Sequence, residues 1–129
     1  MAESTLNKTS EFVDTSKDCI VIINALTDIP GGRTLDVSGL PATMKVIKAG
    51  HPIIKTSAGV FKPLPLNEAG TAFGSKEETD EWVGVLKASI SVKDPRAAIV
   101  TSGQINAAAC PYNITSTIKS GLSRIEFLY

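Results

Sequence analysis

Short apolar runs, cut by glycine and proline turns, are the feature that most constrains the fold of this chain. The run "CIVII" at 19–23 is rich in β-branched residues and is typical of a buried strand. The stretch "DIPGGR" at 28–33 is turn chemistry, because glycine tolerates unusual backbone angles and proline fixes its own φ. Turn signals of this kind recur roughly every eight to twelve residues, which predicts about eight short strands. The expected strands are 19–23, 34–41, 44–48, 52–55, 60–62, 82–92, 97–101 and 125–129.

Two glycines and one helical segment complete the expected architecture. Gly84 interrupts the strand at 82–92 and predicts a bulge or a close backbone approach, and Gly103 is expected to begin a turn. The segment "ITSTIKSGL" at 114–122 is the helical candidate, with Asn113 or Thr115 as its N-cap and Gly121 at its end. Its shared apolar face consists of Ile114, Ile118 and Leu122. The predicted fold class is therefore mainly β with one short helix, in a small compact barrel or clip.

The first 18 residues differ from the rest of the chain. They are polar and show no apolar periodicity, which predicts a flexible N-terminal arm (1–18) ahead of a single β-rich domain (19–129). Phe12 and Val13 are its adjacent bulky pair, and Leu6 lies upstream. Two interpretations stay open: a plain disordered tail, or an arm that orders on a partner by adding a strand to an exposed sheet edge.

Charge and hydropathy exclude several classes of protein. The 13 Lys and Arg balance the 13 Asp and Glu, so the chain lacks the basic excess of a nucleic-acid-binding protein. No apolar run approaches the roughly 18 residues of a membrane span, and residues 1–18 lack the apolar core of a signal peptide. We therefore expect synthesis in the cytoplasm, with no nucleic acid and no membrane among the partners.

The two cysteines, Cys19 and Cys110, allow two interpretations. One is a disulfide or a reactive thiol. The other, which a reducing compartment favours, is a pair of small buried apolar residues. Two cysteines and one histidine fall short of a zinc pattern, so no metal and no cofactor are expected.

Candidate catalytic residues are sparse. His51 lies between a turn and a strand with no nucleophile motif beside it, so a surface or packing histidine is expected. An acidic cluster, made of Glu77, Glu78, Asp80 and Glu81, has the chemistry of an acid–base pair or a metal cage. In a loop rich in Ser, Thr and Gly, however, solvated side chains are the simpler prediction. A β-clip nucleotidase would need a phosphate motif and a catalytic Asp near the C-terminus, and "SRIEFLY" has neither. We predict no enzyme and no catalytic residue, but a binding or structural protein.

The order of several segments resembles a known family. "VIKAGHPIIKTSAGVFKPLPL" at 46–66, "EWVGVLKASI" at 81–90 and "AAIVTSGQINAAACPY" at 97–112 precede a short helix and a final apolar strand. This order is similar to the head decoration and head fibre proteins of tailed bacteriophages, which include the lambda-type trimeric decoration protein. The resemblance covers roughly residues 35–129, and its most specific piece is the stretch from Gly103 to Pro111.

The resemblance implies a mixed β fold in a tight trimer, seated on the outer capsid surface at local three-fold positions and bound to the major capsid protein. It implies an arm that pairs with the shell, so Leu6, Phe12 and Val13 are the candidate capsid-binding residues. The candidate trimer-interface residues are Asn106, Ala107, Ala108, Ala109, Pro111, Phe127 and Tyr129. For the three alanines, a crowded symmetric centre and ordinary packing within one subunit both stay open. Segment 19–34 departs from the pattern and looks more like the head-fibre relatives, which leaves open a role as the base of a projecting fibre.

Two hypotheses about function result. In the first, the chain is a structural virion protein, made in the host cytoplasm, that sits on the outside of the capsid and cements the head. Its partners are the major capsid protein, further copies of itself and, as the base of a head fibre, a fibre protein. In the alternative, it is an adhesion module whose polar loop at 67–81 binds a host glycan or protein.

Overall fold

A computed structural model describes residues 13–129, and β-strands are its main secondary structure. The strands are β1 (Ile22–Thr34), β2 (Val46–Ile47), β3 (Pro52–Lys55), β4 (Phe61–Pro63), β5 (Glu81–Leu86), β6 (Ile90–Ser91), β7 (Arg96–Asn106) and β8 (Ile125–Leu128). The helical elements are α2 (Asp18–Val21), the 3₁₀ helix η1 (Ala107–Ala109) and α3 (Ser116–Gly121). A mainly β fold was predicted and is confirmed.

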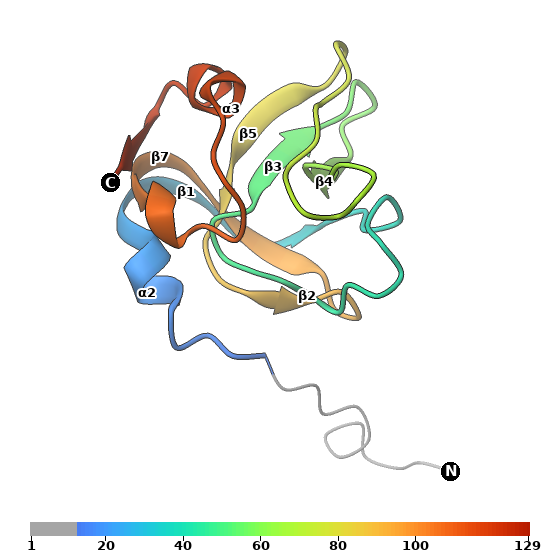
Figure 1. Cartoon of the computed structure of the whole chain (residues 1–129), viewed down its shortest axis with the longest axis horizontal. Coiled ribbons are helices and arrows are strands. Elements are labelled where there is room, and N and C mark those ends of the chain that lie inside the picture. Colours follow the sequence, from blue (N-terminus) through green and yellow to red (C-terminus); the bar gives the residue numbers. More distant parts are fainter. Residues whose placement is uncertain (1–12) are drawn as a thin grey trace.

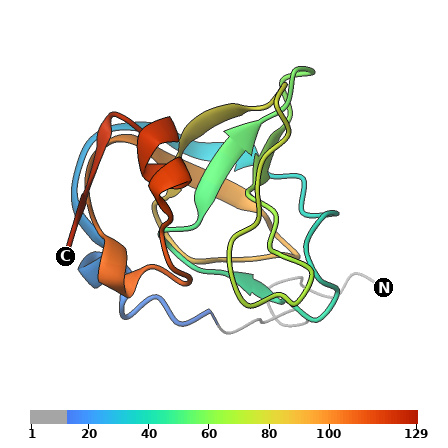
Figure 2. The same cartoon turned by 45° about the horizontal axis from the view of Figure 1, so that its top comes forward.

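Six strands form one twisted sheet (Figures 1 and 2). Antiparallel pairing gives the order β1-β7-β5-β3-β4, and β8 pairs in parallel with the far end of β7. Strands β2 and β6 make a separate two-stranded ribbon. The end strands β1 and β4 do not pair, so the sheet is open. Of the two expected forms, a barrel or a clip, the closed barrel is therefore wrong. Strand β4 is poorly suited to closing a barrel, because it has three residues and ends in Pro63, which has no N–H to donate.

The sheet separates two hydrophobic cores, because successive side chains of its central strands point to opposite faces. The adjacent pairs that divide in this way are Ile53 and Ile54, Val85 and Leu86, and Ile99 and Val100. One member of each pair packs toward α3 and η1, in the core that holds Ile118 and Leu122. The other packs toward the β2–β6 ribbon, in the core that holds Leu35 and Ile47. Burial of both faces explains why these strands read as nearly continuous apolar runs.

Helix α3 forms where its sequence predicts it. The Thr115 hydroxyl accepts a hydrogen bond from the Ile118 N–H at 3.4 Å, so Thr115 rather than Asn113 is the N-cap. The three residues of its predicted apolar face, Ile114, Ile118 and Leu122, are all buried. The helix ends at Gly121, also as predicted.

Segment 19–34 differs from the prediction. Residues 18–21 form α2, and strand β1 begins only at Ile22 and continues through the expected turn at 28–33 to Thr34. Between the pairs Ile29–Ile99 and Arg33–Ala97, β1 advances four residues while β7 advances two. A bulge of this kind accommodates the extra residues, and the missing N–H of proline suits an interrupted ladder. The glycines and proline at 28–33 therefore produce a bulge within a strand, whereas the sequence predicted a turn that ends one.

Three further strand boundaries were wrong. The strand expected at 82–92 is two strands, β5 and β6, in different sheets. The strand expected at 34–41 is absent, because the Asp36 carboxylate accepts hydrogen bonds from the N–H and hydroxyl of Ser38 and stabilises a turn. Strand β7 passes through Gly103 without turning, and a Cβ there would lie 2.1 Å from the Asn24 carbonyl oxygen. Gly84 makes the close approach that was expected, with a Cβ position 2.0 Å from the Val100 oxygen.

Candidate interaction surfaces

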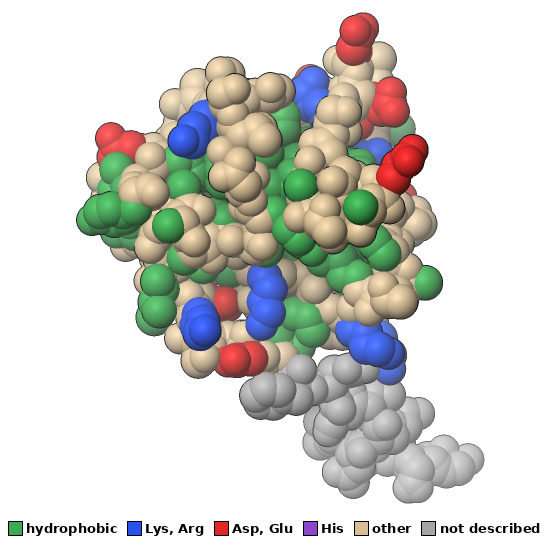
Figure 3. Space-filling view, in the orientation of Figure 1, with side chains coloured by type: hydrophobic (Ala, Val, Ile, Leu, Met, Phe, Trp, Pro, Cys, Tyr) green, Lys and Arg blue, Asp and Glu red, His purple; other side chains and the backbone are tan. Residues whose placement is uncertain are grey.

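Exposed apolar side chains gather at one corner of the molecule. The described residues include five large exposed apolar side chains, and four of them belong to α2, the start of β1 and the chain end after β8. We call these four residues, Ile20, Ile23, Leu26 and Tyr129, the corner surface. Leu26 is 68% exposed and Tyr129 is 90% exposed. Figure 3 shows hydrophobic side chains at the surface on the side where the C-terminus lies. Such a cluster marks a contact site more often than isolated exposed residues do.

Irregular strand pairing turns two of these side chains outward. In the β1–β7 register, Ile22 pairs with Ile105 and Asn24 with Gln104, so Ile23 has no partner. Leu26 is skipped in the same way one step further along. In a regular strand, successive side chains point alternately to the core and to solvent. The extra residue of a bulge does not follow this alternation, so its side chain can point to solvent. Strand β1 is also an edge of the sheet, and an open edge carries unpaired backbone groups suited to a further chain.

Helix α2 is held against the body by a partly buried polar contact. The two Asp18 carboxylate oxygens accept hydrogen bonds from the N–H and the hydroxyl of Ser89, both at 2.8 Å. The Ser89 hydroxyl oxygen in turn accepts the Ala49 N–H at 3.0 Å. Ser89 is buried and Asp18 is partly buried, so these bonds are partly shielded from competing water. The corner surface therefore begins on a fixed element.

A glycine allows three segments to meet at Val21 of α2. Gly50 has a φ of +91°, and a Cβ there would lie 2.7 Å from Val21 and 3.0 Å from the Cys110 sulfur. Pro111 lies 3.5 Å from the same point. Burial raises the pKa of the Cys110 thiol to about 12, so it packs as an apolar group. Cys19, in contrast, is exposed, which contradicts the expectation that both cysteines are buried; both thiols are free.

The predicted trimer-interface residues lie together at this corner. Asn106 caps η1 by accepting the Ala108 N–H at 3.1 Å. The partly buried residues, Ala107, Ala109 and Phe127, pack against the chain's own core, and Pro111 is also partly buried. Ala108 and Tyr129 are exposed. The structure therefore favours packing within one subunit for Ala107 and Ala109, and the trimer contact stays a prediction. Sequence reasoning missed Ile20 and Ile23, because the run "CIVII" predicts a buried strand.

Of the three candidate capsid-binding residues, the structure describes only Val13. Leu6 and Phe12 lie outside the described residues, whereas Val13 is partly buried. The next residue, Asp14, accepts a hydrogen bond through its backbone oxygen from the Lys48 ammonium at 3.2 Å. Asp14 and Lys48 also line a hollow of about 190 Å³ together with Ala109. The described part of the predicted arm therefore starts beside η1.

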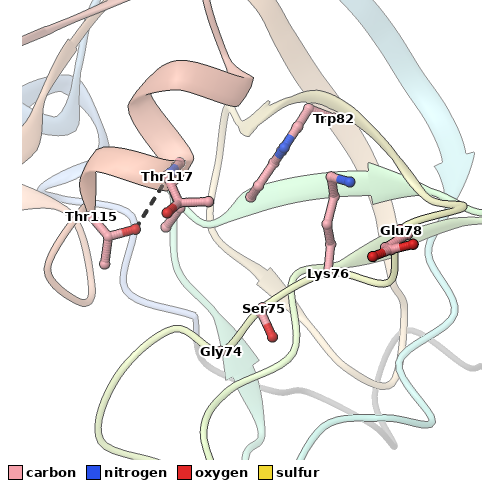
Figure 4. Close-up of a pocket in the computed structure, with 8 residues that line it drawn as sticks. Gly74, Ser75, Lys76, Glu78, Trp82, Thr115 and Thr117 are labelled. Carbon is pink, nitrogen blue, oxygen red and sulfur yellow. Dashed lines mark hydrogen bonds between the residues drawn. The ribbon is translucent and has the colours of Figure 1, made fainter.

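A second candidate surface is a pocket between α3 and the loop after β4 (Figure 4). Its volume is about 390 Å³, within the usual range for small-ligand sites. It is lined by Gly74, Ser75, Lys76, Glu78, Trp82, Thr115, Thr117 and Ile118, and we call it the Trp82 pocket. One wall, made of Gly74, Ser75, Lys76 and Glu78, belongs to the loop at 67–81 that the alternative hypothesis predicted to bind a glycan or a protein. No sequence signal pointed to the wall formed by α3, because the two walls come from segments far apart in the chain.

The acidic cluster predicted in the loop is dispersed in the structure. Glu78 lines the Trp82 pocket, and Glu81 lies 3.7 Å from the Lys55 ammonium. Glu77 is exposed, as predicted. Asp80 is buried, contrary to the prediction, with its Oδ2 3.7 Å from the Lys62 ammonium. Among residues 13–129, no three His, Cys, Asp or Glu side chains lie close enough to hold a metal ion.

His51 is a buried packing residue. Its Nε2 lies 2.8 Å from the Leu64 carbonyl oxygen, so Nε2 carries the proton and donates it. Its Nδ1 is buried and has no hydrogen-bond partner in the described part of the chain. The ring packs edge-on against Phe73, with centroids 5.0 Å apart. Burial, the dominant effect, lowers the pKa of His51 to about 4 although the Leu64 hydrogen bond raises it.

Two searches complete the description. Within the described residues, no helix is long and apolar enough to cross a membrane. Comparisons with protein-family models, with curated proteins and with solved structures give no match.

Proposed function

We propose that this chain is a structural virion protein that assembles with copies of itself, as a trimer, on the outer surface of a tailed-phage capsid. There it binds the major capsid protein and stabilises the head. In this proposal the protein acts by binding to other protein chains. Each subunit contributes weak contacts, and contacts made simultaneously by linked subunits add by avidity.

The observation that carries this proposal is the corner surface. It combines exposed apolar side chains with the open edge of β1, and both features favour contact with another protein chain. The Asp18–Ser89 contact holds its first element in place, so little ordering is needed when a partner docks. The resemblance of the stretch from Gly103 to Pro111 to phage head decoration proteins supports the choice of a capsid as the partner.

The self-association part of the proposal predicts a measurable change in mass. Light scattering of the purified protein should give the mass of three chains, and Leu26→Lys should shift it toward one chain. The lysine would place a charge in an apolar contact, where desolvation is costly. Because Leu26 is mostly exposed within one subunit, the variant should fold normally.

Val60 provides the matched control. It is 42% exposed and apolar but lies outside the corner surface, so Val60→Lys should keep the mass of three chains. A wild-type mass of one chain at every concentration would count against a preformed trimer. Equal masses for Leu26→Lys and the wild type would remove the corner surface from the contact.

The capsid-binding part predicts a dependence on the N-terminal segment. Deleting residues 1–12 should leave the number of chains in the assembly unchanged. It should, however, abolish cosedimentation with phage heads that were assembled without this protein. The deletion stops there because Asp14 contacts Lys48 and Asp18 anchors Ser89. A larger deletion would test folding and binding together. Undiminished cosedimentation of the truncated chain would contradict the role of Leu6 and Phe12.

A further inference from the structure

The Trp82 indole forms one wall of the Trp82 pocket and is fixed by its packing against Gly121. A Cβ on Gly121 would lie 2.1 Å from the Trp82 Nε1 and 2.3 Å from its Cδ1, so the indole packs directly on the backbone at the end of α3. The Lys76 ammonium lies 6.0 Å from the centre of the indole ring, within the usual range of a cation–π contact. Figure 4 shows Trp82 projecting between α3 and the 74–78 segment. An indole fixed in this way offers flat apolar surface at little cost in side-chain entropy.

Polar groups of both kinds surround this wall. Ser75 and Thr117 supply hydroxyls, which both donate and accept, while Glu78 accepts and Lys76 donates. Thr115 uses its oxygen to accept the Ile118 N–H and retains its hydroxyl proton for a ligand. One cation and one anion line the pocket, so their charges balance. The site is therefore matched to an uncharged ligand that has an apolar face and many hydroxyl groups.

We propose that the Trp82 pocket binds one pyranose ring of a neutral carbohydrate. The C–H face of such a ring packs against the indole in place of the Lys76 ammonium, which in this structure lies 6.0 Å from the ring centre. The sugar hydroxyls then exchange hydrogen bonds with Glu78, the displaced Lys76 and the threonine hydroxyls. An anionic sugar would meet Glu78, and a purely apolar side chain would leave the charged groups of the rim desolvated and unpaired. This activity goes beyond the assembly function and does not depend on it, because no residue of the corner surface lines the pocket.

The single tryptophan of the chain makes the test direct, since all indole fluorescence comes from Trp82. The full-length protein is titrated with maltose, lactose and N,N′-diacetylchitobiose, each a neutral disaccharide. We expect at least one of them to shift the emission saturably, with a dissociation constant on the order of 1 mM. A matching shift of the single indole N–H resonance in NMR spectra would locate the sugar at the same ring.

Substitutions at the neighbouring residues Glu77 and Glu78 distinguish a loss of sugar binding from a general effect of removing a negative charge. Glu78→Gln should weaken the sugar by about tenfold, as expected when a charge-assisted hydrogen bond is lost. Glu77→Gln removes the same charge from an exposed residue outside the pocket and should leave the constant unchanged. Circular dichroism confirms that both variants fold. The proposal is overturned if none of the three sugars gives a saturable change, if only a charged sugar or a peptide does, or if both variants bind equally well.

Discussion

Gly84→Ala is expected to destabilise the protein by about 3 kcal/mol or more, a large part of the stability of an ordinary domain. A Cβ at this position would lie 2.0 Å from the Val100 carbonyl oxygen and 2.8 Å from its carbon. These are backbone atoms of the neighbouring strand, so no side-chain rotation can relieve the overlap. Strand β5 would have to move away from β7, and both cores meet at this pair of strands.

Gly39→Ala is the matched control, because a Cβ there meets nothing within 4 Å and the residue has no positive φ. Urea unfolding followed by Trp82 fluorescence compares the two variants with the wild type. Gly39→Ala should unfold at the wild-type midpoint or slightly above it, since alanine reduces the entropy of the unfolded chain. An unchanged midpoint for Gly84→Ala would mean that β5 and β7 are further apart than the structure has them.

Acid is expected to weaken the fold between pH 6.5 and about 4, through His51. In the unfolded chain, His51 takes up a proton near pH 6.5. In the folded protein the pKa of His51 is about 4, so it is protonated only at that lower pH. Because the folded pKa is the lower one, the stability is complete above pH 6.5 and declines as the pH falls through this window. The shift corresponds to a loss of about 3 kcal/mol. A proton on Nδ1 would create a buried charge without a partner among the described residues.

His51→Gln tests this pH dependence. The glutamine amide can donate to the Leu64 carbonyl in place of Nε2, yet it does not titrate, so stability should be nearly flat from pH 6.5 to about 4. Asp14, Asp36 and Asp94 do not obscure the result. Hydrogen bonds lower the pKa of each below 3.8, so their contribution is lost only at more acid pH. An equal decline in the wild type and His51→Gln would assign the effect to other groups.

The helix and the central strands were predictable because their signals are local. Thr115, the apolar spacing from Ile114 to Leu122 and the stop at Gly121 all lie within one short segment. Strand β3 was predicted with its observed bounds, because two neighbouring β-branched residues between turn signals suit a strand buried on both faces. For these elements, side-chain chemistry and backbone preference agree.

The candidate surfaces were less predictable, because contacts distant in the chain create them. The run at 19–23 is apolar enough for a core, yet the β1–β7 register leaves Ile23 and Leu26 unpaired and turns them to solvent. Asp80 belongs to a polar loop, yet it is buried beside Lys62 of β4. The Trp82 pocket needs the end of α3 placed against β5, which no periodicity encodes.

Local patterns thus established a mainly β chain with one capped helix, a neutral charge balance and the close approach at Gly84. Strand register and the meeting of remote segments established the open sheet, the division into two cores, the corner surface and the pocket. The physical reason is the range of each effect. Caps, turns and alternation act over a few neighbouring residues, whereas a bulge or a pocket depends on which partner strand or helix lies opposite, and that is set only when the whole chain packs.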